Sequence, residues 1–186
     1  SLEASYAFFD KGDEKYFDKV EKYETAVNSI DEELTTYLID ISNESLSVSE
    51  NEILASVLDS VRDLERIGDL AVASASLSQH IHSKGIEFSE TAKAELADVY
   101  NRTHRIILDS IRVVVDDDKV LAGQVILRHE ELEKLAKQLR KIHTKRLNNG
   151  ECTAQAGINY VDYLSHYTRI AAHAINLVEK VTAGVI

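Results

Sequence analysis

The sequence contains no proline, methionine or tryptophan, and only seven of its 186 residues are glycine. Proline and glycine interrupt helices most strongly, so their scarcity leaves long helices free to form. The single cysteine, Cys152, excludes an intrachain disulfide and a cysteine-rich zinc module, and it fits a reducing compartment. Strand signals are also missing, because no segment alternates apolar and polar residues between turn clusters. The sequence therefore predicts an all-α protein.

Long apolar runs are absent as well. No signal peptide is recognisable, and no run reaches the roughly 18 apolar residues that a membrane span needs. Because the chain lacks an initiator methionine, we expect a mature product or a fragment and do not treat Ser1 as a natural start.

The net charge of −11 is distributed unevenly. Residues 1–84 hold 7 Lys/Arg against 18 Asp/Glu, whereas residues 85–186 hold 14 of each. This acidic excess argues against nucleic acid as a partner and against direct docking on anionic lipid. Two interpretations remain open: the acidic half carries a cation-binding face, or its charges only solvate the helices.

Apolar spacing predicts one short helix and five long ones, at residues 2–10, 14–43, 48–82, 89–115, 118–148 and 154–183. An offset of about 105 positions superposes Val27, Ile30, Leu34 and Tyr37 on Leu132, Leu135, Leu139 and Ile142. We therefore expect two three-helix units in tandem, residues 1–84 and 85–186. In this interpretation the first helix of the first unit is clipped before Ser1.

One carboxylate falls on the apolar side of a predicted helix. On a helical wheel of residues 48–82, Glu65 lies within the apolar stripe and Asp69 on its shoulder. A buried carboxylate costs several kcal/mol unless it is protonated, paired or bound to a cation. The four-residue spacing stacks the two carboxylates one turn apart, and Gly68 between them leaves room for a neighbouring backbone or a ligand.

The preceding predicted helix carries a matching pair, Glu24 and Asn28. Together with Glu65 and Asp69 they predict an oxygen-rich metal site between two helices, suited to Mg, Ca, Mn, Fe or Zn. The alternative is that Glu65 pairs with Arg66, Arg62 or a lysine while Glu24 and Asn28 are solvated.

Catalytic patterns are not recognisable. No glutamate is followed three residues later by histidine, which disfavours ferritin-like di-iron chemistry. No nucleophile constellation or phosphate-binding glycine loop stands out, so we expect no enzymatic activity. His129, His166 and His173 are expected to be hydrogen-bonded or solvated.

Two segments resemble a known family. Residues 63–71, Asp-Leu-Glu-Arg-Ile-Gly-Asp-Leu-Ala, resemble the repeated LERIGDHA motif of the PhoU family of phosphate-uptake regulators. Residues 143–152 and 169–176 are similar to the PhoU-type domain that follows the membrane part of bacterial sodium/phosphate cotransporters. The resemblance implies a fold of two three-helix bundles whose E(D)xxxD pairs hold iron or zinc.

Carried over residue by residue, the resemblance implies metal ligation by Glu65 and Asp69, with Glu24 at the acidic position of the partner pair and Asn28 beside it. The second half departs from the pattern. Thr168 and Ala172 stand where the motif has its acids, and the partner pair reads His129 and Glu133. At most one weakly held ion is expected there, on His129, Glu133 or His173.

The first functional expectation is a regulatory PhoU-like domain of sodium-dependent phosphate transport at the cytoplasmic face of the cell membrane. Its partner would be a transporter membrane domain in the same full-length chain, and a second copy could form a homodimer. One alternative is a free-standing PhoU-type regulator of an ABC phosphate transporter and its sensor kinase. Another is a carboxylate-bridged helical-bundle metalloprotein.

Overall fold

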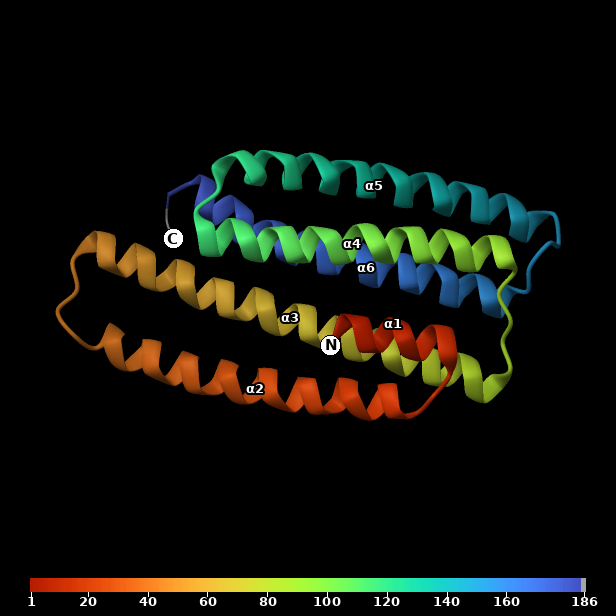
Figure 1. Cartoon of the computed structure of the whole chain (residues 1–186), viewed down its shortest axis with the longest axis horizontal. Coiled ribbons are helices and arrows are strands. Elements are labelled where there is room, and N and C mark those ends of the chain that lie inside the picture. Colours follow the sequence, from red (N-terminus) through yellow and green to blue (C-terminus); the bar gives the residue numbers. More distant parts are fainter. Residues whose placement is uncertain (185–186) are drawn as a thin grey trace.

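The computed structural model describes residues 1–184 and contains six helices (Figure 1). In chain order they are α1 (Leu2–Lys11), α2 (Lys15–Ser42), α3 (Val48–Lys84), α4 (Glu90–Asp116), α5 (Lys119–Asn148) and α6 (Ala154–Thr182). No strand occurs in this part of the chain. The all-α prediction is confirmed, and each helix begins and ends within about two residues of its predicted bounds.

The helices pack in two groups of three. The first group comprises α1, α2 and α3, and the second comprises α4, α5 and α6. Helices α3 and α6 run antiparallel and join the groups, with a minor contact between α1 and α4. Figure 1 places α2 and α5 at opposite edges of the molecule. We call the α3–α6 interface the seam.

Local signals in the sequence account for several helix ends. Ser47 and Glu50 form a capping box at the start of α3, in which each side chain bonds the backbone of the other. Asp118 accepts hydrogen bonds from the first turn of α5. Gly12 ends α1 in the left-handed conformation, with φ of 65°, which glycine adopts without strain.

The largest apolar core surrounds α6, which contacts α3, α4 and α5. Tyr160, Tyr163 and Tyr167 follow one face of α6 and are almost completely buried. Tyr163 shares a hydrogen bond of 2.6 Å with Ser78 on α3, so a polar group of the seam is satisfied inside the core. This central position explains why α6 is apolar around most of its circumference.

Helix α1 has 10 residues, whereas α4, its counterpart in the second group, has 27. The segments of α2 and α3 farthest from the α1–α2 connection are therefore covered less completely. An apolar groove of about 320 Å³ lies there, with Ile30 and Leu34 on one wall and Ile107 and Ile111 on another. Ile30 is 56% exposed, so part of this groove wall faces solvent.

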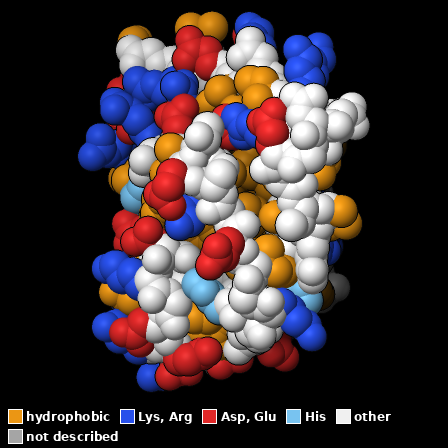
Figure 2. Space-filling view, turned by 90° about the vertical axis from the view of Figure 1, so that its right-hand side faces the viewer, with side chains coloured by type: hydrophobic (Ala, Val, Ile, Leu, Met, Phe, Trp, Pro, Cys, Tyr) orange, Lys and Arg blue, Asp and Glu red, His pale blue; other side chains and the backbone are white. Residues whose placement is uncertain are grey.

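Within residues 1–184 no helix is both long enough and apolar enough to cross a bilayer. Figure 2 views the end of the molecule at which α5 ends and α6 begins. Lys and Arg side chains gather in its upper part, and acidic side chains follow its lower edge. Basic and acidic side chains are mixed over the rest of this end of the molecule.

Candidate metal centre

Helices α2 and α3 come close together at Gly68. A Cβ atom at this position would lie 3.1 Å from Glu24 Oε2 and 3.5 Å from Val27 Cγ1. Glycine therefore gives the Glu24 carboxylate room to lie against the α3 backbone. The sequence predicts that Gly68 leaves such space, and the structure shows that Glu24 occupies it.

The Glu24 Oε2 atom is buried and has no hydrogen-bond partner. An unpaired buried carboxylate oxygen is costly, and a cation, a proton or a water molecule would each relieve that cost. This unpaired oxygen is the observation that best fits the predicted cation site. It lies against Gly68, which stands between Glu65 and Asp69 in the sequence.

Glu65 and Asp69 lie one turn apart on α3, as their spacing predicts. Glu65 also lines the apolar groove. The pKa of the Glu65 carboxyl is raised from 4.5, chiefly by burial and then by repulsion from Asp69, while Arg66 opposes the shift. Carboxylates placed so close favour holding a proton or a cation between them.

Arg66 supplies positive charge to this pair. Its Nη1 donates a hydrogen bond of 3.1 Å to Asp69 Oδ2, and its Nε lies 3.6 Å from Glu65 Oε2. The alternative prediction, that Glu65 pairs with Arg66, thus describes contacts that are present. A bound cation would compete with this guanidinium.

Asn28 lies on the exposed side of α2, one turn beyond Glu24. Among the residues that the structure describes, no three His, Cys, Asp or Glu side chains converge as a metal-binding group. The fold therefore brings Glu24 against α3 and sets Glu65 beside Asp69. Side-chain rotation would be needed to gather these oxygens around one ion.

Sequence reasoning missed Asp63, an acid that is 8% exposed in the seam and contacts three side chains of α6. Asp63 Oδ1 accepts a hydrogen bond of 2.8 Å from Asn176 and lies 3.0 Å from His173 Nδ1, and Oδ2 lies 3.2 Å from Lys180 Nζ. The spacing of His173, Asn176 and Lys180 on one face of α6 is the signal that points to this network. These groups also line a surface pocket of about 550 Å³.

Among the described residues, the second-half candidates do not form a metal-binding group of three. His173 lies beside Asp63, and Glu133 lies 3.8 Å from Lys137. Thr168 donates a hydrogen bond to the Leu164 carbonyl of its own helix. His129 Nε2 is buried without a partner. The carboxylate pairing of the first half is thus not repeated here.

The family profile of the PhoU domain matches residues 1–77 and 96–181, which lie in the first and second helical groups. The chain belongs to the PhoU family. This result confirms the resemblance carried by the LERIGDLA segment.

One curated relative shares limited sequence identity with the chain. The chain is 29% identical over 128 residues to a phosphate-specific transport system accessory protein, PhoU homolog 1, of Thermotoga maritima. That match covers 69% of this chain but only 54% of the relative, so the chain spans about half the length of this curated protein.

Two solved structures share the fold. PhoU from Pseudomonas aeruginosa superposes with a TM-score of 0.83 at 22% identity, covering 97% of this chain and 87% of that structure. The phosphate transport system regulatory protein PhoU from Streptococcus pneumoniae superposes with a TM-score of 0.82 at 15% identity, covering 97% and 84%. These identities support the fold alone.

Proposed function

We propose that this chain regulates phosphate uptake by binding to the transport machinery, without bond-making chemistry of its own. The observation that carries the proposal is the match of the PhoU profile to both helical groups. The name of the Thermotoga relative, an accessory protein of phosphate-specific transport, supports it. That name favours a separate regulator over the first expectation of a domain joined to a sodium/phosphate cotransporter.

Uptake measurements test this function directly. A bacterium whose own PhoU gene is deleted would receive this chain, and radiolabelled phosphate uptake would be compared with the parent and the empty-vector strain. We expect uptake to return toward the parental rate. Unchanged uptake at a verified protein level would contradict the proposal.

A cation site is the second part of the proposal. Glu65 and Asp69 would supply the primary ligands, with Glu24 approaching from α2 and Asn28 adding an amide oxygen. Iron or zinc follows from the family resemblance, and Mg, Mn or Ca would also suit oxygen donors. The buried, unpaired Glu24 oxygen supports this assignment. An ion bridging α2 and α3 would stiffen the least covered part of the first group.

Metal content measured by mass spectrometry separates this site from a solvated acidic surface. Glu65→Ala with Asp69→Ala should lose most of the bound ion. Glu14→Ala with Asp18→Ala is the matched control, because it removes two exposed acids at the same spacing, one directly before α2 and one in its first turn. Equal metal content in the wild-type chain and both double variants would exclude the site, provided that circular dichroism shows that each variant is folded.

A further inference from the structure

Helix α5 carries a charge opposite to that of the chain. It holds eight Lys/Arg and three Asp/Glu, a net charge of +5 with histidine neutral. Helix α2 holds three Lys and seven Asp/Glu, a net charge of −4. Because these helices lie at opposite edges of the molecule (Figure 1), the protein has a basic edge and an acidic edge.

The basic charge of α5 is concentrated in its second half. Residues 134–148 contain six Lys/Arg and no Asp/Glu. Four lysines in this segment recur at helical spacing and are exposed to solvent; they are Lys134, Lys137, Lys141 and Lys145. Steps of three, four and four residues place them on one side of the helix. We call these four residues the lysine stripe.

Few acidic groups neutralise the lysine stripe. Glu130 lies 3.8 Å from Lys134, and Glu133 lies 3.8 Å from Lys137. Both ion pairs are within α5 and exposed, so they hold little interaction energy and leave the lysine charges available. Helix α5 packs only against α4 and α6 among the described residues, and its outer side is therefore open.

Apolar side chains continue the same line toward the start of α5. Val120 is 75% exposed and Leu127 is 60% exposed. They lie 14 and 7 positions before Lys134, which is nearly the same direction around the helix. Ile142, 42% exposed, borders the lysine stripe. A row of lysines beside exposed aliphatic groups is the composition of a helix that lies at a membrane surface.

We propose that the outer side of α5 docks this protein on an anionic phospholipid bilayer. Lysines suit mobile headgroups because each is a flexible point charge without a fixed bidentate geometry. The opposite acidic edge does not prevent this contact. The α3–α6 layer separates α2 from α5 by more than the Debye length of about 8 Å at physiological salt.

The net charge of the whole chain argues against docking on anionic lipid only if the charges are spread evenly over the surface. The fold separates the two signs, and a flat bilayer meets only one edge. A second copy of the chain fits less well as the occupant. Pairing α5 with α2 of another copy joins two different surfaces, and such a head-to-tail contact builds a ring or an open filament instead of a two-fold dimer.

Vesicle flotation tests the proposal. The probes are vesicles of phosphatidylcholine alone and vesicles with about 30% phosphatidylglycerol, at about 50 mM and about 300 mM salt. We expect the wild-type chain to float only with the anionic vesicles and to dissociate at the higher salt. Absence of flotation at low salt overturns the proposal and leaves an acidic protein surface as the candidate partner.

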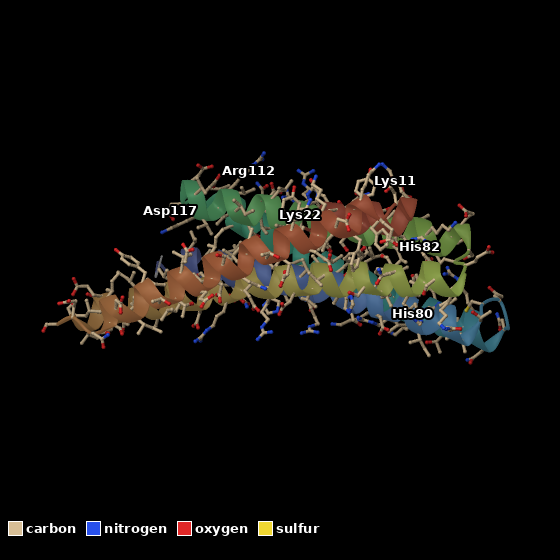
Figure 3. The ribbon with its side chains drawn as sticks, turned by 90° about the horizontal axis from the view of Figure 1, so that it is seen from below. Lys11, Lys22, His80, His82, Arg112 and Asp117 are labelled. Carbon is tan, nitrogen blue, oxygen red and sulfur yellow. The ribbon has the colours of Figure 1, made fainter. Side chains whose placement is uncertain are left out.

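Variants locate the contact. Replacing the four residues of the lysine stripe with glutamine should weaken partitioning at least about a hundredfold, since each lysine contributes about fivefold. The matched control replaces four exposed lysines near the acidic edge with glutamine: Lys11, Lys15, Lys19 and Lys22. It changes the net charge by the same amount as the stripe variant. Lys11 and Lys22 are labelled in Figure 3. Control and stripe variants that weaken binding equally would contradict docking through α5. Arginine at the four stripe positions should preserve it.

Discussion

Asp63 on α3 and Lys180 on α6 form an ion pair across the seam, with 3.2 Å between Oδ2 and Nζ. Their side chains are only 12% and 18% exposed. Replacing Asp63 with alanine leaves Lys180 without its carboxylate partner, and we expect a loss of about 3 kcal/mol in the free energy of unfolding. Urea denaturation measures this loss. Asp59→Ala, one turn earlier in an exposed pair with Arg62, should change stability by less than about 0.5 kcal/mol.

Gly68→Ala tests the close approach of α2 and α3. The added methyl group would meet the Glu24 carboxylate at 3.1 Å, so this side chain must turn away. Alanine has a higher helix propensity than glycine, which offsets part of the cost of this clash. The free energy of unfolding should therefore change by less than about 1 kcal/mol. Cation affinity should fall by about tenfold if Glu24 is a ligand. Unaltered affinity, measured by calorimetry, would remove Glu24 from the site.

Gly157→Ala should be much more damaging. Its Cβ would lie 2.7 Å from His143 Nε2 and 2.9 Å from Leu147 Cδ2, between α5 and α6. Overpacking of this kind costs about 1–3 kcal/mol. Gly123→Ala on α5 is the control, because nothing lies within 4 Å of its Cβ position. We expect Gly123→Ala to be neutral or stabilising by up to about 1 kcal/mol, and equal losses would refute the packing argument.

Burial is the chief cause that lowers the pKa of the His166 imidazole from 6.5. The Oγ atom of Ser74 lies 3.1 Å from His166 Nδ1. The unfolded chain then binds more protons than the folded protein below about pH 6.5. Stability should therefore fall as the pH decreases through this range. His166→Gln should reduce that dependence in urea titrations at several pH values.

His80→Gln is the matched control for His166, since His80 is exposed near the end of α3 (Figure 3). It should leave the pH dependence of stability unchanged. His82 is a poorer control, because its Nε2 lies 3.2 Å from the Phe8 carbonyl oxygen on α1. An equal effect of His80→Gln and His166→Gln would show that burial of His166 is not the cause.

Burial and the nearby Asp69 raise the pKa of the Glu65 carboxyl above 4.5. The folded protein therefore favours neutral Glu65 more than the unfolded chain does. This contribution to stability is fully present below pH 4.5 and is lost as the pH rises through the raised pKa. Glu65→Gln imitates the neutral form. In the absence of metal it should raise the thermal midpoint at pH 7 and have little effect at pH 4. Glu52→Gln, at an exposed position of α3, should not shift the midpoint. A lower midpoint for Glu65→Gln at pH 7 would indicate that the contact with Arg66 dominates.

Sequence reasoning identified the helices because their signals are local. Apolar periodicity, the Ser47–Glu50 capping box and Asp118 each act within a few residues of the helix they shape. The neighbouring positions of Glu65 and Asp69 follow from helix geometry for the same reason. The wheel assigns α3 one buried side, but α3 contacts both α2 and α6. The prediction therefore singled out Glu65 and overlooked Asp63.

By itself, the sequence determined the all-α class, the helix bounds, the carboxylate pair on α3 and the basic composition of residues 134–148. Tertiary structure decided which groups meet: Glu24 with Gly68 across 44 positions, and Asp63 with Lys180 across 117. It also placed α2 and α5 at opposite edges, which turns a net charge into two charged sides. Contacts between distant positions depend on how the helices pack, and packing is set by the combined burial of all six apolar surfaces.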